Sequence, residues 1–367
     1  MGTDYDIVIV GAGIAGVGLA AALGSGHRIA ILEQEERPAY HSTGRSAAIF
    51  IRNYGNAVIR ALSAASAPLF ERGDPALFAH SLLTARGVLN VANEDGLHHH
   101  AALLAESDGL RELSPAEAHS MVPALRIERI AAAAFEADAQ DIDVAALHEG
   151  WLRKARGEGA TLMLRAPLIA ADRAGGAWRL KTANGDLTAG SLVNAAGAWA
   201  DHVAAIAGVV PLGLVPMRRS MAVLPAPEGH DIAAWPLIAD SAEGWYVKPD
   251  AAKLYVSPAE QIPVEPHDAF VDDMVLAEGL DRFEQAFDIA VTRVERSWAG
   301  LRTFAPDRTP VAGYDAGVEN FFWLAGQGGY GIQTAPALSA LAAALVTGSS
   351  PPDGLESIVA ALSPGRF

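Results

Sequence analysis

Two glycine-rich loops are the first residues whose types and spacing suggest chemistry. The first, Gly11-Ala12-Gly13-Ile14-Ala15-Gly16, follows an apolar run and precedes a helical pattern, and Glu33 lies 20 residues beyond Gly13. Glycines at this spacing let a pyrophosphate approach the backbone and the N-terminus of the following helix. A carboxylate at that distance can accept the hydroxyl protons of an adenosine ribose. The first loop therefore predicts a dinucleotide-binding βαβ unit.

The second loop, AGQGGYGIQT at residues 325–334, repeats the glycine spacing near the C-terminus. A second nucleotide site would need another strand and an acid about 20 residues later. Only 36 residues follow Gly331, and Gly348-Ser349-Ser350-Pro351-Pro352 predicts a loop at that position. We therefore expect the helix from Ile332 to direct its N-terminal N–H groups at the N1–C2 carbonyl end of a reduced isoalloxazine. Both loops would then serve one FAD.

The composition restricts the class of protein. With 367 residues and 51% hydrophobic residues, the chain can bury a large core. Its 43 acidic and 27 basic residues give a formal charge of −16, which disfavours binding to nucleic acids and to anionic membranes. The absence of cysteine excludes disulfides, thiol catalysis and a cysteinyl-linked cofactor. Without a signal-peptide pattern or an apolar run of about 20 residues, we expect a cytoplasmic protein with no transmembrane segment.

Hydrophobic periodicity predicts the elements that position these loops. Buried strands are expected at residues 6–10, 28–32, 162–164, 167–171, 178–182 and from 191. Helices are expected at residues 14–23, from the N-cap Asp143 to about 156, at 272–287 and at 335–346. Asn184-Gly185 predicts a hairpin, and the strand-rich stretch 215–257 predicts a substrate layer. The triplet His98-His99-His100 lacks carboxylate partners at ligand spacing, which predicts a solvated loop and no metal site.

Eight motifs, in this order along the chain, resemble those of a known family. They are GAGIAG at 11–16 with Glu33, HSTGRSAA at 41–48, DID at 141–143, VNAAGAW at 193–199, PMRRS at 216–220, WYVKPD at 245–250, WAGLR at 298–302 and QGGYGIQT at 327–334. Together they resemble the D-amino acid oxidase (DAO) superfamily of FAD enzymes, in its glycine and sarcosine oxidase group. The resemblance is strongest to D-amino acid dehydrogenases of the D-arginine dehydrogenase type.

The resemblance implies an α/β fold with two interleaved domains. A Rossmann-like FAD-binding domain of the glutathione-reductase type would comprise residues 1–78, 142–212 and 300–367. An α+β substrate domain on a mainly antiparallel sheet would comprise residues 79–141 and 213–299.

The resemblance also implies non-covalent FAD. Arg45 and Ser46 would lie against the phosphates and ribityl chain, with the backbone of residues 44–48 beside the flavin ring. The complete set of expected FAD contacts is Gly11, Gly13, Ile14, Ala15, Gly16, Glu33, Gln34, Gly44, Arg45, Ser46, Ala47, Ala48, Ala196, Gly197, Trp199, Gly300, Arg302, Gly328, Gly329, Tyr330, Gly331, Ile332 and Gln333.

For an amino acid substrate, the resemblance assigns carboxylate binding to Arg219 and Arg302. Guanidinium groups suit this role because they bind a carboxylate through two parallel hydrogen bonds. Tyr246 and Tyr54 match hydroxyl donors, and Gly329 matches a carbonyl that accepts from the amine. Tyr54 lies in residues 49–55, which resemble a mobile lid. The implied reaction is hydride transfer from Cα to flavin N5, giving an imino acid that hydrolyses to a 2-oxo acid and ammonia.

Departures from the arginine-specific relatives predict a different substrate side chain. Ile49 stands where those enzymes have a histidine, and Gly87 stands where they have a glutamate. A guanidinium buried against isoleucine without a partner would be costly. With Ile51, these residues suggest a roomy apolar pocket closed on one side by Gln333, which favours a neutral D-amino acid.

The electron acceptor is predicted by one further departure. Oxidases of the sarcosine type place a lysine over the flavin, whereas the corresponding position here is Tyr255. This favours a dehydrogenase that uses a quinone or another acceptor, although Lys248 or Lys253 could reverse that inference. We expect a monomer or weak dimer. Three alternatives stay open: a 2-hydroxy acid dehydrogenase, a secondary-amine oxidase of the sarcosine or glycine type, and a flavin-bound binding protein without turnover.

Overall fold

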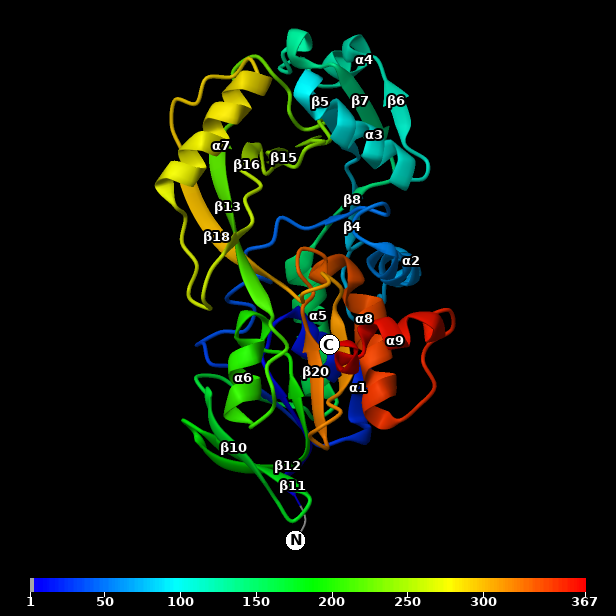
Figure 1. The fold of residues 1–367 in the computed structure, drawn as a ribbon, viewed down its shortest axis with the longest axis vertical. Coiled ribbons are helices and arrows are strands. Elements are labelled where there is room, and N and C mark those ends of the chain that lie inside the picture. Colours follow the sequence, from blue (N-terminus) through cyan, green and yellow to red (C-terminus); the bar gives the residue numbers. More distant parts are fainter. Residues whose placement is uncertain (1–2) are drawn as a thin grey trace.

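The computed structural model describes residues 3–367 and consists of two lobes, each built around its own sheet (Figure 1). The lower lobe in that view carries both glycine loops on a largely parallel sheet. The upper lobe carries a mainly antiparallel sheet, and the long strands β13 and β18 run from it toward the lower lobe. This confirms the predicted α/β fold with a parallel FAD-type sheet and an antiparallel second sheet.

The lower sheet is buried on both faces. β1 (Tyr5–Val10) pairs in parallel with β2 (Ile29–Leu32) and β12 (Gly185–Asn194), and the parallel set continues to β9 (Thr161–Met163) and β20 (Phe321–Ala325). Along β1, Ile7 and Ile9 pack into one core and Val8 and Val10 into another. Side chains alternate between the two faces of a strand, so a continuous apolar run fits a sheet covered on both sides.

Helices cover the two faces of this sheet. α1 (Ile14–Leu23), α5 (Val144–Gly157) and α8 (Gly331–Thr347) lie on one face, and α6 (Ala200–Ile206) lies on the other. The predicted bounds of α1 are correct, and Asp143 caps α5 by accepting from the Ala146 N–H. α2 (Ala57–Arg72) and the short α9 (Val359–Leu362) complete this lobe.

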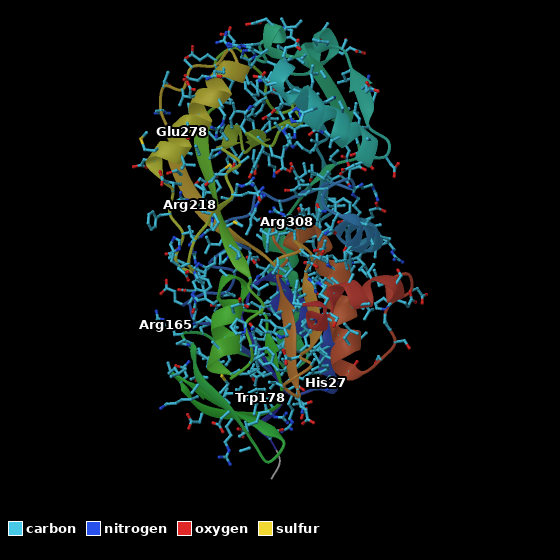
Figure 2. All side chains as sticks on the ribbon, in the orientation of Figure 1. His27, Arg165, Trp178, Arg218, Glu278 and Arg308 are labelled. Atoms are coloured by element: carbon cyan, nitrogen blue, oxygen red, sulfur yellow. The ribbon has the colours of Figure 1, made fainter. Side chains whose placement is uncertain are left out.

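An antiparallel meander extends the lower sheet away from the second lobe. It consists of β10 (Leu168–Ala174), β11 (Ala177–Thr182) and the first half of β12, with Trp178 at the foot of the lobe (Figure 2). The predicted hairpin at Asn184-Gly185 is confirmed, and Gly185 has φ +120°. β19 (Val311–Tyr314) pairs antiparallel with β20, which lies on the same side of β12 as β11.

The upper sheet has nine strands and one parallel pairing. Its strands are β5 (Val88–Ala92), β6 (Arg111–Leu113), β7 (Ala132–Glu136), β13 (Val215–Pro225), β14 (Leu237–Asp240), β15 (Tyr246–Asp250), β16 (Lys253–Ser257), β17 (Ile262–Pro263) and β18 (Arg296–Phe304). Only β5 and β14 run parallel. β18 continues past residue 299, where the sequence predicted a domain boundary.

Helices α3 (Leu97–Glu106), α4 (Pro115–Met121) and α7 (Asp273–Ala286) surround the upper sheet. α7 matches its prediction and begins at the N-cap Asp272. The solvated loop predicted at His98 to His100 is wrong, because these residues form the first turn of α3. His100 is buried and its Nδ1 lies 2.8 Å from the Ser241 hydroxyl.

A small three-stranded sheet lies where the lobes meet. It pairs β3 (Ile49–Phe50) and β4 (Leu83–Ala85) with the central β8 (Gln140–Ile142). β3 follows directly after the turn 44–48, and the Ile142 N–H at the end of β8 donates to the Ala48 carbonyl oxygen at 3.3 Å, so this sheet holds the end of that turn.

Candidate active site

Two adjoining cavities of about 350 and 270 Å³ lie along the first glycine loop, and only the larger one reaches the upper lobe. They share Gly13, Ser42, Thr43, Ala195 and Gly197, and therefore form one elongated groove. The smaller cavity lies at the ends of β1 and β2, and the larger one reaches from the glycine loops to the upper sheet. An extended ligand could occupy both.

Glu33 lies at the end of β2 and lines the smaller cavity. It is 8% exposed, and its Oε2 accepts from the Ala12 N–H at 3.0 Å while its Oε1 accepts from the Glu35 N–H at 3.0 Å. These two donors fix the carboxylate beside the first glycine loop, where it can still accept from ribose hydroxyls. Gln34 and Trp199 line the same cavity.

The first glycine loop has no room for a side chain at Gly11 or Gly16. Gly11 has φ +108°, and a Cβ there would lie 2.4 Å from the Ala195 carbonyl oxygen. A Cβ at Gly16 would lie 2.0 Å from the Gly11 oxygen. Gly16 does not line either cavity, so it serves helix packing, whereas Gly11 and Gly13 form the groove wall. This cradle, with Glu33 beside it, fits the diphosphate and ribose of FAD.

The turn 44–48 lines the larger cavity through Arg45, Ser46, Ala47 and Ala48, but not through Gly44. The Arg45 guanidinium already donates to the carbonyl oxygens of Tyr40, Ala269 and Ala299, and it pairs with Asp268. It thus joins this turn to the second lobe. Its expected contact with the FAD phosphates stays a prediction, and these partners compete with it.

The second glycine loop presents the N-terminus of α8 to the larger cavity. Gly328, Gly329, Gly331, Ile332 and Gln333 line it, whereas Tyr330 does not. Gly328 has φ +55°, and a Cβ there would overlap the Phe304 ring at 2.2 Å. A Cβ at Gly329 would lie 3.0 Å from Arg302 Nη1, so glycine permits close approach of the loop to that guanidinium.

Arg219 and Arg302 lie on neighbouring strands and on the same face of the upper sheet. In the antiparallel β13–β18 pair, Arg219 is opposite Gly300 and Arg302 is two residues farther along. Residues two apart on a strand share a face, so the arginines are diagonal neighbours. Both line the larger cavity, and within residues 3–367 neither guanidinium forms an ion pair with a carboxylate.

The electrostatics of this arginine pair favour an anion. Burial lowers the pKa of Arg219, and the charge of Arg302 lowers it further. Burial also acts to lower the pKa of Arg302, but Tyr54 and Tyr246 reverse this and leave it raised. Both arginines stay protonated at any working pH. Arg219 Nε donates to the Glu260 carbonyl oxygen at 2.8 Å, which leaves its terminal nitrogens for a ligand.

The two predicted tyrosines lie beside the arginines. Arg302 Nη1 donates to the Tyr54 hydroxyl at 3.5 Å, and the Tyr246 ring centre lies 5.9 Å from Arg219 Cζ. Tyr330 packs edge-on against Tyr54 with ring centres 4.7 Å apart. Burial raises the pKa of Tyr330 to about 12, so its hydroxyl stays protonated at neutral pH.

An apolar cluster forms the wall next to Tyr246. Ile49, Ile51, Leu237 and Ala239 line the cavity there together with Val88. Gly87, expected to widen the pocket, does not line it. Its φ is +74°, and a Cβ there would lie 2.7 Å from the Phe135 ring, so the strand turn requires glycine at this position.

Several lining residues were missed by sequence reasoning. Thr43 accepts from the Ile14 N–H at 3.0 Å, Trp298 donates to the Arg45 carbonyl oxygen at 3.1 Å, and Asn90 and Glu136 line the larger cavity. They come from separate strands and turns, and only tertiary contacts bring them together. Tyr255 does not line the cavity and instead packs edge-on against Trp298.

A metal-ligand cluster and a membrane-spanning helix are both absent from the described chain. Residues 3–367 contain no cluster of three His, Asp or Glu side chains that could hold a metal ion. None of the helices in this same range is long and apolar enough to cross a membrane.

Sequence comparison identifies relatives. FAD-dependent oxidoreductase domain-containing protein 1 of Xenopus laevis is 29% identical over 179 residues, covering 42% of this chain and 34% of that protein. Mitochondrial dimethylglycine dehydrogenase of Rattus norvegicus is 27% identical over 240 residues, covering 60% of this chain and 28% of that protein. The chain thus matches about a third of the length of these relatives.

Solved structures share the fold. Glycine oxidase from Geobacillus kaustophilus superposes with a TM-score of 0.85 at 22% identity and covers 100% of both chains. L-Proline dehydrogenase from P. horikoshii gives 0.83 at 20% identity, covering 100% of this chain and 98% of its own. L-Amino acid deaminase from Proteus vulgaris gives 0.82 at 17% identity with the same coverage. The DAO model, described as FAD dependent oxidoreductase, matches residues 6–345. The chain therefore belongs to the DAO family of FAD-dependent oxidoreductases.

Proposed function

We propose that this protein is an FAD-dependent dehydrogenase of neutral D-amino acids. The observation that carries the proposal is the pair of guanidinium groups, Arg219 and Arg302, which line the larger cavity and form no ion pair with a carboxylate of residues 3–367. Two buried like charges are unfavourable unless an anion joins them, and a carboxylate matches the guanidinium fork. Carboxylate binding would orient the substrate in the cavity that the flavin-side loops also line.

Gly11, Gly13 and Glu33 would hold the diphosphate and ribose of FAD, and the turn 44–48 with Gly328 to Gln333 would adjoin the flavin. Bound FAD would supply the redox chemistry by accepting a hydride from the substrate Cα at N5. We propose that the FAD is held non-covalently.

The substrate amine would lie near the Gly329 carbonyl, as the family motif implies. Arg219 and Arg302 would act on it as well as on the carboxylate. Nearby positive charge lowers the pKa of an ammonium group, so binding would favour loss of its proton to solvent. No dedicated base is then required, and Tyr54 and Tyr246 would contribute orientation through their hydroxyls.

The apolar wall of Ile49, Ile51, Val88 and Leu237 supports a neutral substrate side chain of moderate size. The preference for the D-enantiomer rests on the motifs shared with D-amino acid dehydrogenases, since two structural neighbours are named for L-amino acid substrates. We further propose a quinone or similar acceptor, because Tyr255 stands where sarcosine-type oxidases place a lysine.

A secondary amine carrying a carboxylate is the second candidate. The name of one structural neighbour, L-proline dehydrogenase, favours it because proline is such an amine, and the same arginine pair could bind such a substrate.

Anaerobic bleaching of flavin absorbance tests the proposal. The FAD-loaded protein would be mixed with matched panels of D- and L-amino acids, N-methyl amino acids and 2-hydroxy acids. Fast reduction by neutral D-amino acids, with little by D-arginine, is the expected result. Reduction only by another panel would discard the substrate assignment, and reduction by none would favour a binding protein without turnover.

A further inference from the structure

A buried carboxylate in the larger cavity has no role in the proposed chemistry. Glu136 ends β7, is 3% exposed and lines the cavity. Its Oε1 accepts from the backbone N–H groups of Arg52 at 3.1 Å and Asn53 at 3.4 Å. A carboxylate that accepts two backbone hydrogen bonds is an anchor for the segment that donates them.

The anchored segment is the turn 51–54, which joins β3 to the approach of α2. Its opposite side is held by Gln333 at the start of α8. The Gln333 Oε1 accepts from the Ile51 N–H at 3.3 Å, and its Nε2 donates to the Ile51 carbonyl oxygen at 3.3 Å. The turn is therefore fixed from the upper lobe by Glu136 and from the lower lobe by Gln333.

The turn carries two residues of the substrate site. Ile51 belongs to the apolar wall, and the Tyr54 hydroxyl receives the hydrogen bond from Arg302 at 3.5 Å. Only a short piece of backbone therefore separates the amides that Glu136 holds from Tyr54, which lies at the carboxylate-binding end of the cavity. Burial raises the pKa of Glu136, while its hydrogen bonds with Asn53 oppose that rise.

We propose that Glu136 is a positioning residue that holds the turn 51–54 closed against the upper lobe, keeping Ile51 and Tyr54 in place for substrate. The proposal rests on the proposed function for its substrate-binding consequence. Its structural part, the hold of Glu136 on the turn, does not depend on which substrate is correct.

A matched pair of substitutions tests it in the FAD-loaded full chain. Glu136→Gln keeps an acceptor oxygen, whereas Glu136→Met keeps the length and removes every acceptor. Asp138→Asn is the control, because Asp138 pairs with the Arg52 side chain at 2.8 Å on the exposed side of the same turn. Hydrogen–deuterium exchange of the peptide containing residues 51–54 reports the hold directly. KM and kcat are measured with the amino acid that bleaches the flavin fastest.

For Glu136→Met we expect exchange in this peptide to become at least about ten-fold faster, because both amides lose their acceptor. KM should rise about ten-fold with a smaller change in kcat, since the turn contributes to binding in ground and transition states alike. Glu136→Gln and Asp138→Asn should stay within about three-fold of the native protein in both measurements.

Unchanged exchange in Glu136→Met would overturn the proposal whatever the substrate. Native exchange in Glu136→Gln combined with a KM as high as that of Glu136→Met would also overturn it, because the carboxylate charge would then act on the substrate directly. If Glu136→Met shows fast exchange throughout the chain, Glu136→Gln decides: a protected turn supports the proposal and an unprotected one contradicts it. Absence of flavin bleaching by any panel would count against the proposed function alone.

Discussion

Within residues 3–367 neither Arg219 nor Arg302 forms an ion pair with a carboxylate, although the charge of Glu260 acts on Arg219. The face of β13 and β18 that carries them places Gly300 opposite Arg219, so no side chain covers the guanidinium from that position. Unpaired buried cations persist where function requires them, because pairing them internally would remove the binding site. The two guanidinium groups repel each other. Binding of an anion relieves this repulsion, and the relief contributes to the free energy of binding.

Arg302→Ala should abolish rapid flavin reduction while FAD stays bound. Removing one partner of a buried charge-assisted contact typically costs about 2–5 kcal/mol, so kcat/KM should fall by a factor between about 30 and several thousand. Anaerobic stopped-flow bleaching measures this loss. Arg293→Ala is the control, because Arg293 is an exposed arginine that pairs with Glu295 at 2.8 Å. Native reduction rates in Arg302→Ala would remove Arg302 from the site.

Glu33→Ala should weaken FAD retention without altering the fold. The carboxylate is fixed by the Ala12 and Glu35 amides, and its loss would remove a charge-assisted hydrogen bond to the ribose. We expect the Kd for FAD to rise at least about ten-fold. Release of fluorescent FAD during dialysis measures it. Glu36→Ala, at an exposed glutamate paired with Arg165 at 3.0 Å, should bind FAD like the native protein.

At the scale of elements, α5 contributes a titratable residue, His148, that is hydrogen-bonded to the first glycine loop. His148 is buried, and its Nε2 donates to the Ala12 carbonyl oxygen at 2.9 Å. Burial lowers the pKa of His148 below its usual value of 6.5, although this hydrogen bond acts in the opposite direction. The folded chain therefore binds fewer protons at this residue than the unfolded chain does.

The sign of the pH dependence follows from that difference. The contribution of His148 to the free energy of unfolding is fully present above pH 6.5. It is lost as the pH falls from 6.5 through the pKa that His148 has in the folded protein. In that interval the slope from this one residue cannot exceed about 1.4 kcal/mol per pH unit. His148→Gln, which keeps a donor, should lose less stability than the native protein between about pH 7.5 and pH 5.5 in urea unfolding. Parallel losses in both proteins would contradict the assignment.

Elements whose signals are local were predictable from the sequence. α1, the Asp143 cap of α5 and the hairpin at Asn184-Gly185 all depend on residues within a few positions of one another. The sequence predicted a loop at His98 because a glycine-containing turn precedes it. In the structure, His100 is hydrogen-bonded to Ser241, which lies 141 residues away. This long-range contact lies outside any short sequence window.

The geometry of the site could not be predicted from motifs alone, because it too depends on contacts between residues far apart in the sequence. The motifs led to Arg219 and Arg302, but their diagonal placement depends on the β13–β18 register, which pairs residues about 80 apart in sequence. The sequence predicted that Gly87 widens the pocket. Its positive φ and the nearby Phe135 ring show instead that the turn requires glycine at this position. Glu136 carries no motif, so only the three-dimensional contacts bring it to the turn 51–54.

At the scale of the whole molecule, the groove lies between lobes whose segments alternate along the chain. β3, β4 and β8 connect them, and Arg45 joins the flavin-side turn to Ala269 and Ala299 of the second lobe. Figure 2 shows Arg308 at this junction, where its guanidinium lies over the Phe304 ring at 4.1 Å. A ligand bound in the groove would contact both lobes and therefore stabilise the complete fold. The domain bounds and the monomer or weak dimer remain predictions.

Removal of FAD should lower the thermal midpoint of the whole chain in one transition. A ligand that binds only the folded state adds about 2.7 kcal/mol at a hundred-fold excess over its Kd, so the midpoint should rise with the logarithm of FAD concentration. ADP can fill only the Glu33 end of the groove, so it should bind more weakly and raise the midpoint less than FAD at equal free ligand concentration. Differential scanning calorimetry of the apoprotein with each ligand measures both effects. Because residues of both lobes line the larger cavity, an equal effect of ADP and FAD would show that this cavity does not hold the flavin.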